Sequence, residues 1–149
     1  MTGRIEAMNA AERRIAGALL LLRLTLGGFL MQWGIEKFVN PTMAAGIAEH
    51  FYGISLSATL AYGHGAVEVI VAAALLLGLY RRPTYALAAL GHGISVVASY
   101  RQLLAPYTDI NHLFAASVPV LGAFIALYLL RDCDRYSLDA WRGRGGNNV

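Results

Sequence analysis

The sequence has little charge and almost no cysteine. Charged residues make up only 14% of its 149 residues, whereas soluble globular domains carry about a quarter. Hydrophobic residues make up 57%, in runs that approach or exceed the ~18–20 residues needed to cross a bilayer. This composition excludes a soluble protein built around one large core. It predicts a single-domain integral membrane protein.

Cysteine occurs once, at Cys133, which excludes an intrachain disulfide and a Cys-x-x-Cys dithiol. Any redox chemistry must therefore come from a cofactor, a quinone or a partner protein. The net charge of +3 comes from basic residues that flank the apolar runs. Membrane topology explains that charge, and no nucleic-acid partner is expected.

Apolar segments and their boundaries predict an all-α bundle of membrane-spanning helices. Four segments are long enough: 15–38, 58–79, 84–104 and 112–130. A clean break falls at Arg81-Arg82-Pro83, and a kink is expected at Pro119 inside the last span. The expected organisation is a cytoplasmic segment, a four-helix bundle and a flexible cytoplasmic tail: 1–14, 15–131 and 132–149.

Lysine and arginine predict the orientation of this bundle. With the N-terminus inside, only Lys37 and Arg101 fall on the outer side. The flanking basic residues that fall on the cytoplasmic side are Arg4, Arg13, Arg14, Arg81, Arg82, Arg131, Arg135, Arg142 and Arg144. This asymmetry predicts that both termini are cytoplasmic.

Polar residues within the apolar segments follow helical spacing. The first span carries one stripe at intervals of four and three residues, made of Arg23, Gly27, Leu30, Gly34 and Lys37. Its two glycines allow a neighbouring helix to approach closely, so Arg23 is predicted to face protein rather than lipid.

Depth along the spans gives Arg23 a predicted partner. At about 1.5 Å per residue, Arg23 and His92 lie roughly 12 Å, and Glu68 roughly 18 Å, from the inner ends of their spans. An unpaired charge at such depth is costly. The sequence therefore predicts a buried Arg23–Glu68 pair, with His92 as a further hydrogen-bond partner and His64 one helical turn from Glu68.

A second polar group is expected near the outer surface: Glu36, Lys37, His64, Arg101, Asp109 and His112. Lys37 and Arg101 can instead extend toward lipid headgroups, and His112 can cap a helix in water. A metal site is a weaker alternative, with His64, Glu68, His92 and Glu36 as ligands. There is no phosphate-binding glycine motif and no nucleophilic triad.

These motifs together resemble the DoxX-like family of small four-helix bacterial membrane proteins. The similarity lies in an arginine in the first span, the ending Gly34-x-x-Lys37-Phe38, the motif Gly65-x-x-Glu68 and the later stretch LLLGLYRRP. The resemblance covers about Leu19 to Leu130. It implies a compact bundle in the bacterial cytoplasmic (inner) membrane. His64, His92 and His112 do not map onto a family motif.

The resemblance also implies a redox context, because relatives look like subunits of a thiosulfate:quinone oxidoreductase or accompany thiol and oxidative-stress enzymes. The expected function is a membrane subunit that handles quinone or a small sulfur or thiol compound. The candidate catalytic residues are Arg23, Glu68, His64 and His92. The candidate substrate-binding residues are Lys37, Arg101 and His112. Quinone is the favoured cofactor, ahead of a metal.

Two other functions fit the same residues. A small-solute or ion permease would conduct along a polar seam, and four helices would then require a homo-oligomer. A non-catalytic scaffold or assembly partner of a redox enzyme would use the Arg23–Glu68 pair only to set helix register. The expected partners are accordingly the lipid bilayer, a redox-enzyme subunit and further copies of the chain.

Overall fold

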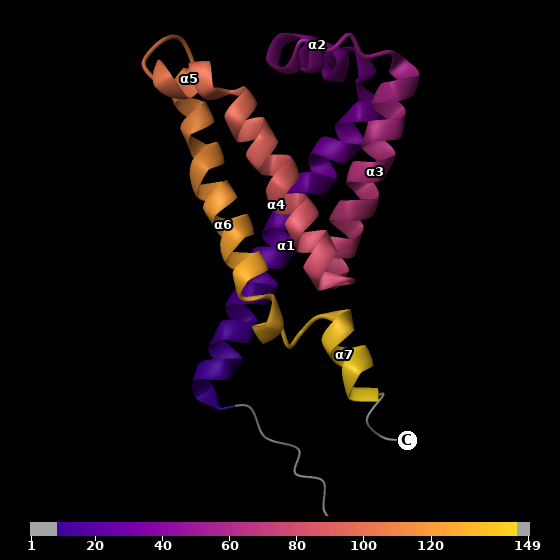
Figure 1. Ribbon diagram of the computed structural model, residues 1–149, viewed down its shortest axis with the longest axis vertical. Coiled ribbons are helices and arrows are strands. Elements are labelled where there is room, and N and C mark those ends of the chain that lie inside the picture. The colour runs from indigo at the N-terminus through magenta and orange to yellow at the C-terminus, as the bar shows by residue number, and fades with distance from the viewer. Residues whose placement is uncertain (1–8, 146–149) are drawn as a thin grey trace, which may run out of the picture.

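The computed structural model describes residues 9–145, and within this range the chain forms helices joined by turns (Figure 1). The long helices are α1 (Ala10–Val39), α3 (Ala58–Leu77), α4 (Arg81–Ala98) and α6 (Ser117–Leu129). The short ones are α2 (Pro41–Tyr52), α5 (Tyr100–Leu104), the 3-10 turns η1 (Asn111–Ala116) and η2 (Arg131–Cys133), and α7 (Leu138–Gly145). We call the end that carries α2 and α5 the outer end, and the end that carries α7 the inner end (Figure 1).

Helix α1 starts five residues before the predicted span because its first turn is capped. The Asn9 side chain accepts a hydrogen bond from the Glu12 backbone, and the Glu12 carboxylate accepts one from the Asn9 backbone, both at 2.9 Å. This reciprocal capping box satisfies two amides that would otherwise lack partners. Most of the predicted N-terminal segment, residues 1–8, lies outside the described residues.

Within residues 9–145, three helical stretches are long and apolar enough to cross a membrane: Ala10–Val39, Ala58–Leu77 and Asn111–Leu129. They correspond to the first, second and fourth predicted spans. The third predicted span divides at Ser99 into α4 and α5, and α4 opens with two arginines and a proline. The predicted kink at Pro119 is replaced by a change of helix type, because η1 gives way to α6 two residues earlier and Pro119 falls in the first turn of α6.

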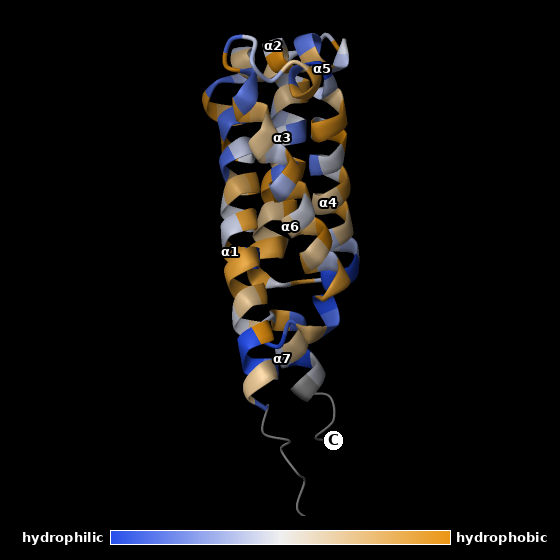
Figure 2. Ribbon diagram, turned by 90° about the vertical axis from the view of Figure 1, so that its left-hand side faces the viewer, coloured by the Kyte–Doolittle hydropathy of each residue, from blue (hydrophilic) through white to orange (hydrophobic). Residues whose placement is uncertain are grey.

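The core of the bundle is apolar and draws on every long helix. Leu26, Leu75, Tyr85 and Phe124 represent α1, α3, α4 and α6 in one continuous buried cluster. Large apolar side chains also cover the outside: Leu21, Leu24, Val67, Ile70, Leu87, Leu90, Ile94, Val97, Val118, Ile125 and Leu129 are 45–71% exposed. Hydrophobic residues dominate the middle of the bundle and hydrophilic ones gather near its ends (Figure 2). This distribution is that of a multi-pass membrane protein, with the lipid bilayer as its surroundings.

Helices α1 and α3 form the most extensive contact between helices, and glycines make it possible. A Cβ atom added to Gly34 would lie 2.8 Å from Val69 Cγ2 and 3.0 Å from Val69 N. A Cβ atom added to Gly65 on α3 would lie 3.0 Å from the Gly34 carbonyl oxygen. The two backbones therefore touch here without intervening side chains, as small residues allow in membrane bundles.

Replacing Gly34 with alanine is expected to destabilise the protein by about 1–3 kcal/mol, because the added methyl group overpacks against the backbone of α3. Gly28 is the matched control on the same helix, since a Cβ atom there meets nothing within 4 Å. Gly28→Ala is expected to be neutral or stabilising by up to about 1 kcal/mol. Unfolding titrations in mild detergent measure both variants, and equal stability of the two would contradict this reading of the α1–α3 contact.

The segment after α6 contacts the bundle through Asp134 to Asp139 and continues as α7 to Gly145, whereas the sequence predicted a flexible tail from residue 132. Asp134 and Ser137 are buried, at 0% and 3% exposure. The Asp139 backbone N–H donates to the Gly78 carbonyl oxygen at 3.2 Å, which holds α7 against the end of α3. Residues 146–149 of the predicted tail lie outside the described residues.

Candidate functional site

Arg23 is buried in the bundle, as its stripe predicted, but its partner is not Glu68. The Arg23 Nη1 donates to Asp134 Oδ2 at 3.0 Å, and its Nη2 donates to the Tyr136 carbonyl oxygen at 2.9 Å. The Tyr85 hydroxyl donates to the same Asp134 oxygen at 2.6 Å. Arg23, Tyr85 and Asp134 are at most 3% exposed, and we call them the inner cluster. The predicted Arg23–Glu68 pair is therefore wrong.

The register of α1 against α3 explains the error. Gly34 lies against Val69, Gly27 lies against Leu76, and Arg23 reaches Gly78 at the end of α3. The prediction aligned the inner ends of the two helices, but α1 begins at Ala10 and extends past the end of α3 (Figure 1). Eleven residues separate Arg23 from Gly34 on α1, a rise of about 16 Å. Arg23 and Glu68 consequently lie at different levels.

Glu68 is paired with Lys37 instead, toward the outer end. The Lys37 Nζ lies 2.5 Å from Glu68 Oε2, and it also donates to the Trp33 carbonyl oxygen at 3.2 Å. The two side chains are 13% and 23% exposed, so this pair is only partly shielded. We call Lys37 and Glu68 the outer pair. Because α1 and α3 approach closely at Gly34 and Gly65, the Lys37 side chain on α1 reaches Glu68 on α3.

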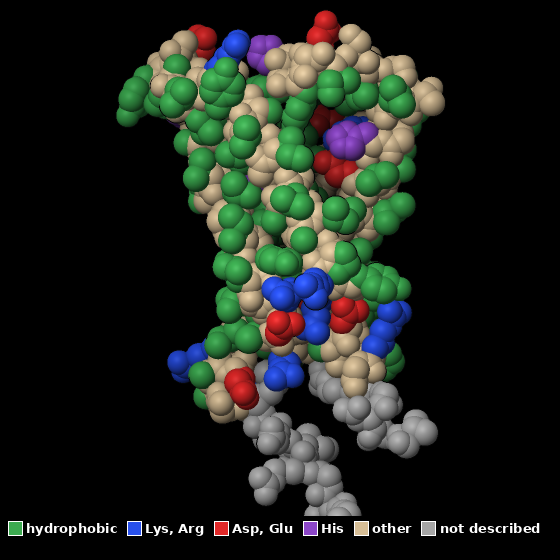
Figure 3. Space-filling model, viewed as in Figure 1, with side chains coloured by type: hydrophobic (Ala, Val, Ile, Leu, Met, Phe, Trp, Pro, Cys, Tyr) green, Lys and Arg blue, Asp and Glu red, His purple; other side chains and the backbone are tan. Residues whose placement is uncertain are grey.

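Near the outer pair in sequence, α1 and α3 also carry a histidine and a stacked pair of aromatic residues. His64 is exposed and lies one helical turn from Glu68 on α3. Phe38 and Tyr62 stack across α1 and α3 with ring centroids 5.9 Å apart and an interplanar angle of 8°. A histidine side chain lies beside acidic and basic side chains in a hollow near the outer end, above a largely hydrophobic surface (Figure 3). Ionisable side chains therefore lie close to the apolar outer surface of α1 and α3.

His92 belongs to the core rather than to either charged group. Its Nε2 lies 3.0 Å from the Ser117 carbonyl oxygen. A carbonyl oxygen only accepts, so Nε2 carries the proton in this contact. Its ring lies between those of Phe29 and Phe124, with centroids 5.5 and 5.4 Å away. His92 thus links α4 to the start of α6, and the structure does not bring it to Arg23 or Glu68.

The remaining candidates lie on three different elements. Arg101 is exposed on α5 and donates to the neighbouring Tyr100 hydroxyl at 3.0 Å, while His112 is exposed on η1. Glu36 is half-buried on α1. Within residues 9–145 no three His, Cys, Asp or Glu side chains converge as metal ligands. The alternative metal set of His64, Glu68, His92 and Glu36 therefore lacks support.

Asp134 and Tyr85 are the residues of the inner cluster that sequence reasoning missed. Asp134 lies in the stretch RDCDRY, beyond the last predicted span. A signal was present in the stretch NAAE, because Asn9 and Glu12 have capping-box spacing and extend α1 toward the inner end. Because α1 continues past the inner end of α3, Arg23 lies beside Gly78, where an aspartate after the last span is within reach.

The fold and the buried charges define an all-α, multi-pass membrane protein with ionisable pairs at two levels of one helical bundle. The DoxX family model matches residues 18–100, more than half of the chain, and the protein belongs to the DoxX family. No curated protein and no solved structure matches the chain. The outer pair, Arg23 and His92 fall within the matched residues, whereas Asp134 falls after them.

Proposed function

We propose that this DoxX-family protein is the membrane subunit of a redox system, and that its outer pair exchanges protons with a quinone dissolved in the bilayer. The observation that carries the proposal is the Lys37–Glu68 contact of 2.5 Å. It places a partly open carboxylate beside the lipid-facing flank of α1 and α3. Ionisable groups within membrane segments are costly and commonly mark a proton or substrate path.

The chemistry requires two protons and two electrons for each quinone reduced to quinol. Glu68 is placed to deliver protons, and the neighbouring Lys37 ammonium stabilises the carboxylate left behind. His64 is exposed one turn away and can return protons from the outer surface. Phe38 and Tyr62 present flat apolar faces beside which a quinone ring can lie. The electrons come from a redox-enzyme partner subunit that oxidises a small sulfur or thiol compound.

The proposed topology has four spans with α4 included, both termini in the cytoplasm, and the bacterial inner membrane as the location. The inner end carries the arginines of α4 and η2, which agrees with the preference of basic loops for the cytoplasm. In this orientation the outer pair lies in the periplasmic half of the membrane. Arg23 and His92 are left out of the proposed chemistry because both are committed to contacts in the inner cluster and the core.

Replacing Glu68 with glutamine is expected to lower quinone-linked turnover by about 10²–10⁴, because the amide keeps the shape but cannot transfer a proton. The measurement is quinol formation in membranes that contain the protein and its redox partner. Glu49→Gln is the control, since Glu49 is exposed on α2. Unchanged turnover in Glu68→Gln, with native lipids and quinone present, would contradict the proposal.

A scaffold role is the second candidate, favoured by the tight glycine contact that the outer pair spans. A double variant, Lys37→Met with Glu68→Leu, separates the two functions because paired apolar replacement can preserve packing. A folded double variant that keeps full quinone-linked turnover and still co-purifies with the partner supports the scaffold. Loss of turnover with the partner still bound supports proton transfer.

The permease alternative receives less support. The polar groups form clusters at two levels, and the apolar residues Leu30, Ala72 and Leu75 belong to the core between them. A continuous polar seam through one copy of the bundle is therefore not formed by these clusters. Solute flux in liposomes that disappears in Glu68→Gln would restore this alternative, and it would then require a homo-oligomer.

A further inference from the structure

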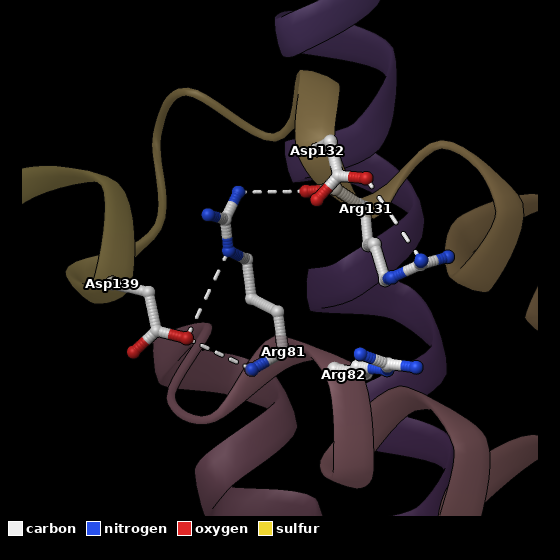
Figure 4. Close-up of a pocket in the computed structure, with 5 residues that line it drawn as sticks. All are labelled: Arg81, Arg82, Arg131, Asp132 and Asp139. Carbon is white, nitrogen blue, oxygen red and sulfur yellow. Dashed lines mark hydrogen bonds and ion pairs between the residues drawn. The ribbon is translucent and has the colours of Figure 1, made fainter. Parts of the chain in front are cut away.

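A basic pocket opens at the inner end of the bundle, away from the outer pair. It has a volume of about 350 Å³ and is lined by Arg81 and Arg82 at the start of α4, Arg131 and Asp132 in η2, and Asp139 in α7. The side chains of Arg81, Arg82 and Arg131 approach it from two different segments (Figure 4). Three positive charges thus face two negative ones.

Backbone groups hold Arg81 in place. Its Nη1 donates to the Arg131 carbonyl oxygen at 2.6 Å and to the Asp134 carbonyl oxygen at 3.1 Å. Carbonyl groups orient a guanidinium without cancelling its charge. The Asp139 carboxylate lies 3.8 Å from Arg81 Nε but accepts its closer bond, at 2.8 Å, from the Arg81 backbone N–H. That carboxylate therefore serves mainly as the cap of α4.

Arg131 is also oriented by neutral groups. Its Nη1 donates to the Tyr128 carbonyl oxygen at 2.8 Å, and its guanidinium lies 4.6 Å from the centre of the Tyr128 ring. The nearest carboxylate is Asp132, 3.9 Å from Nη2 and 83% exposed. A pair so exposed to water contributes little. Most of the positive charge of Arg131 thus remains available to a ligand.

Arg82 supplies the third positive charge and is the least committed of the three. It is exposed, and it makes no hydrogen bond or ion pair with the other residues drawn in Figure 4. It stands beside Arg81 in the first turn of α4, where the helix dipole adds positive potential. The pocket therefore combines two fixed guanidiniums with one that is free to close on a ligand.

The pocket lies where the apolar surface of the bundle ends. Arg131 follows α6 by two residues, and Arg81 and Arg82 open α4. Tyr80 and Trp141 are 68% and 70% exposed at the same end, as aromatic residues are at the membrane–water interface. This is the depth of lipid headgroups. Basic pockets between membrane helices on the cytoplasmic side suit anionic headgroups, and guanidinium forks match phosphate oxygens.

We propose that Arg81, Arg82 and Arg131 bind the phosphate of an anionic lipid headgroup from the inner leaflet. The two fixed guanidiniums position the phosphate, and Arg82 covers it from the side of α4. The bound lipid would bridge α4 and η2. This site is independent of the proposed quinone chemistry, because it involves none of the residues of the outer pair.

The test measures lipid retention by the purified full chain, without quinone or a redox partner. The protein is exchanged into mixed micelles of phosphatidylglycerol and phosphatidylcholine, and native mass spectrometry counts the bound lipids. Wild type is expected to retain phosphatidylglycerol preferentially. Arg82→Gln and Arg131→Gln are each expected to weaken that retention roughly fivefold. Asp132→Asn is expected to strengthen it, and Arg101→Gln, at the outer end, is the matched control.

Arg82→Gln is the decisive variant because its side chain is exposed and its loss should leave the fold intact. Equal retention of the two lipids by wild type would overturn the proposal, as would an equal loss in Arg101→Gln and Arg82→Gln. Inorganic phosphate provides the second arm. If phosphate alone binds in detergent and displaces no lipid, the ligand is soluble phosphate, and the assignment to a lipid is wrong.

Discussion

Replacing Asp134 with alanine is expected to lower the free energy of unfolding by about 3–5 kcal/mol, the usual cost of leaving one member of a buried ion pair alone. Arg23 would keep its bond to the Tyr136 carbonyl oxygen, but it would lose the carboxylate 3.0 Å away and remain 3% exposed. Tyr85 would lose its acceptor at the same time. Denaturant titration or thermal unfolding in mild detergent measures the effect.

Asp132→Asn is the control for Asp134→Ala, since Asp132 is 83% exposed and two residues away. It is expected to change stability by less than about 0.5 kcal/mol. A double variant, Arg23→Met with Asp134→Leu, is expected to recover much of the loss, because it removes the charge as well as its partner. If Asp134→Ala were as stable as Asp132→Asn, the inner cluster would not hold the bundle together.

Gly78→Ala is expected to cost about 2–5 kcal/mol, combining a strained backbone with overpacking. Gly78 ends α3 at a φ of 66°, and an added Cβ atom would overlap Arg23 Nη1 and Ser137 Cβ. It would also lie 2.9 Å from Ser137 Cα, where no side-chain rotation gives relief. The variant should therefore separate α7 from α3 and displace the Arg23 guanidinium. Unfolding in detergent and protease cleavage within α7 report the two effects.

Gly53 separates the two causes in that prediction. It ends α2 at the same φ of 66°, yet a Cβ atom there meets nothing within 4 Å. Gly53→Ala should show only the backbone cost of about 1–2 kcal/mol. A Gly78→Ala protein no less stable than Gly53→Ala would mean that α7 moves away from Gly78 without cost.

The first span shows what helical periodicity can predict from the sequence alone. The predicted stripe is confirmed at Arg23, Gly27, Leu30 and Gly34, which are buried, and Lys37 ends it half-buried. Spacing along one helix fixes which side chains share a face, whatever the neighbouring helix is. The same reasoning placed His64 and Glu68 together, and they remain one turn apart on α3.

Pairing between helices depends on register, which periodicity does not contain. Depth measured from the predicted ends of the two spans pairs Glu68 with Arg23. In the structure Gly34, rather than Arg23, lies at the level of Glu68, and Lys37 is the residue that reaches the carboxylate. His92 shows a second limit of sequence periodicity. Its ring on α4 contacts Phe29 on α1 and Phe124 on α6, and the spacing within α4 does not reveal these partners. A polar residue on an inward face can be a core residue as readily as a catalytic one.

The distance in sequence between Arg23 and Asp134 also bears on how the protein is made. The two residues are 111 positions apart, and the chain is synthesised from its N-terminus. Helices α1, α3, α4 and α6 therefore all leave the ribosome before the carboxylate that neutralises Arg23. Until then the guanidinium depends on water and headgroups near the inner surface for solvation. Completion of the inner cluster therefore waits for the segment that follows α6, and a chain cut before Asp134 is expected to leave Arg23 without its carboxylate partner.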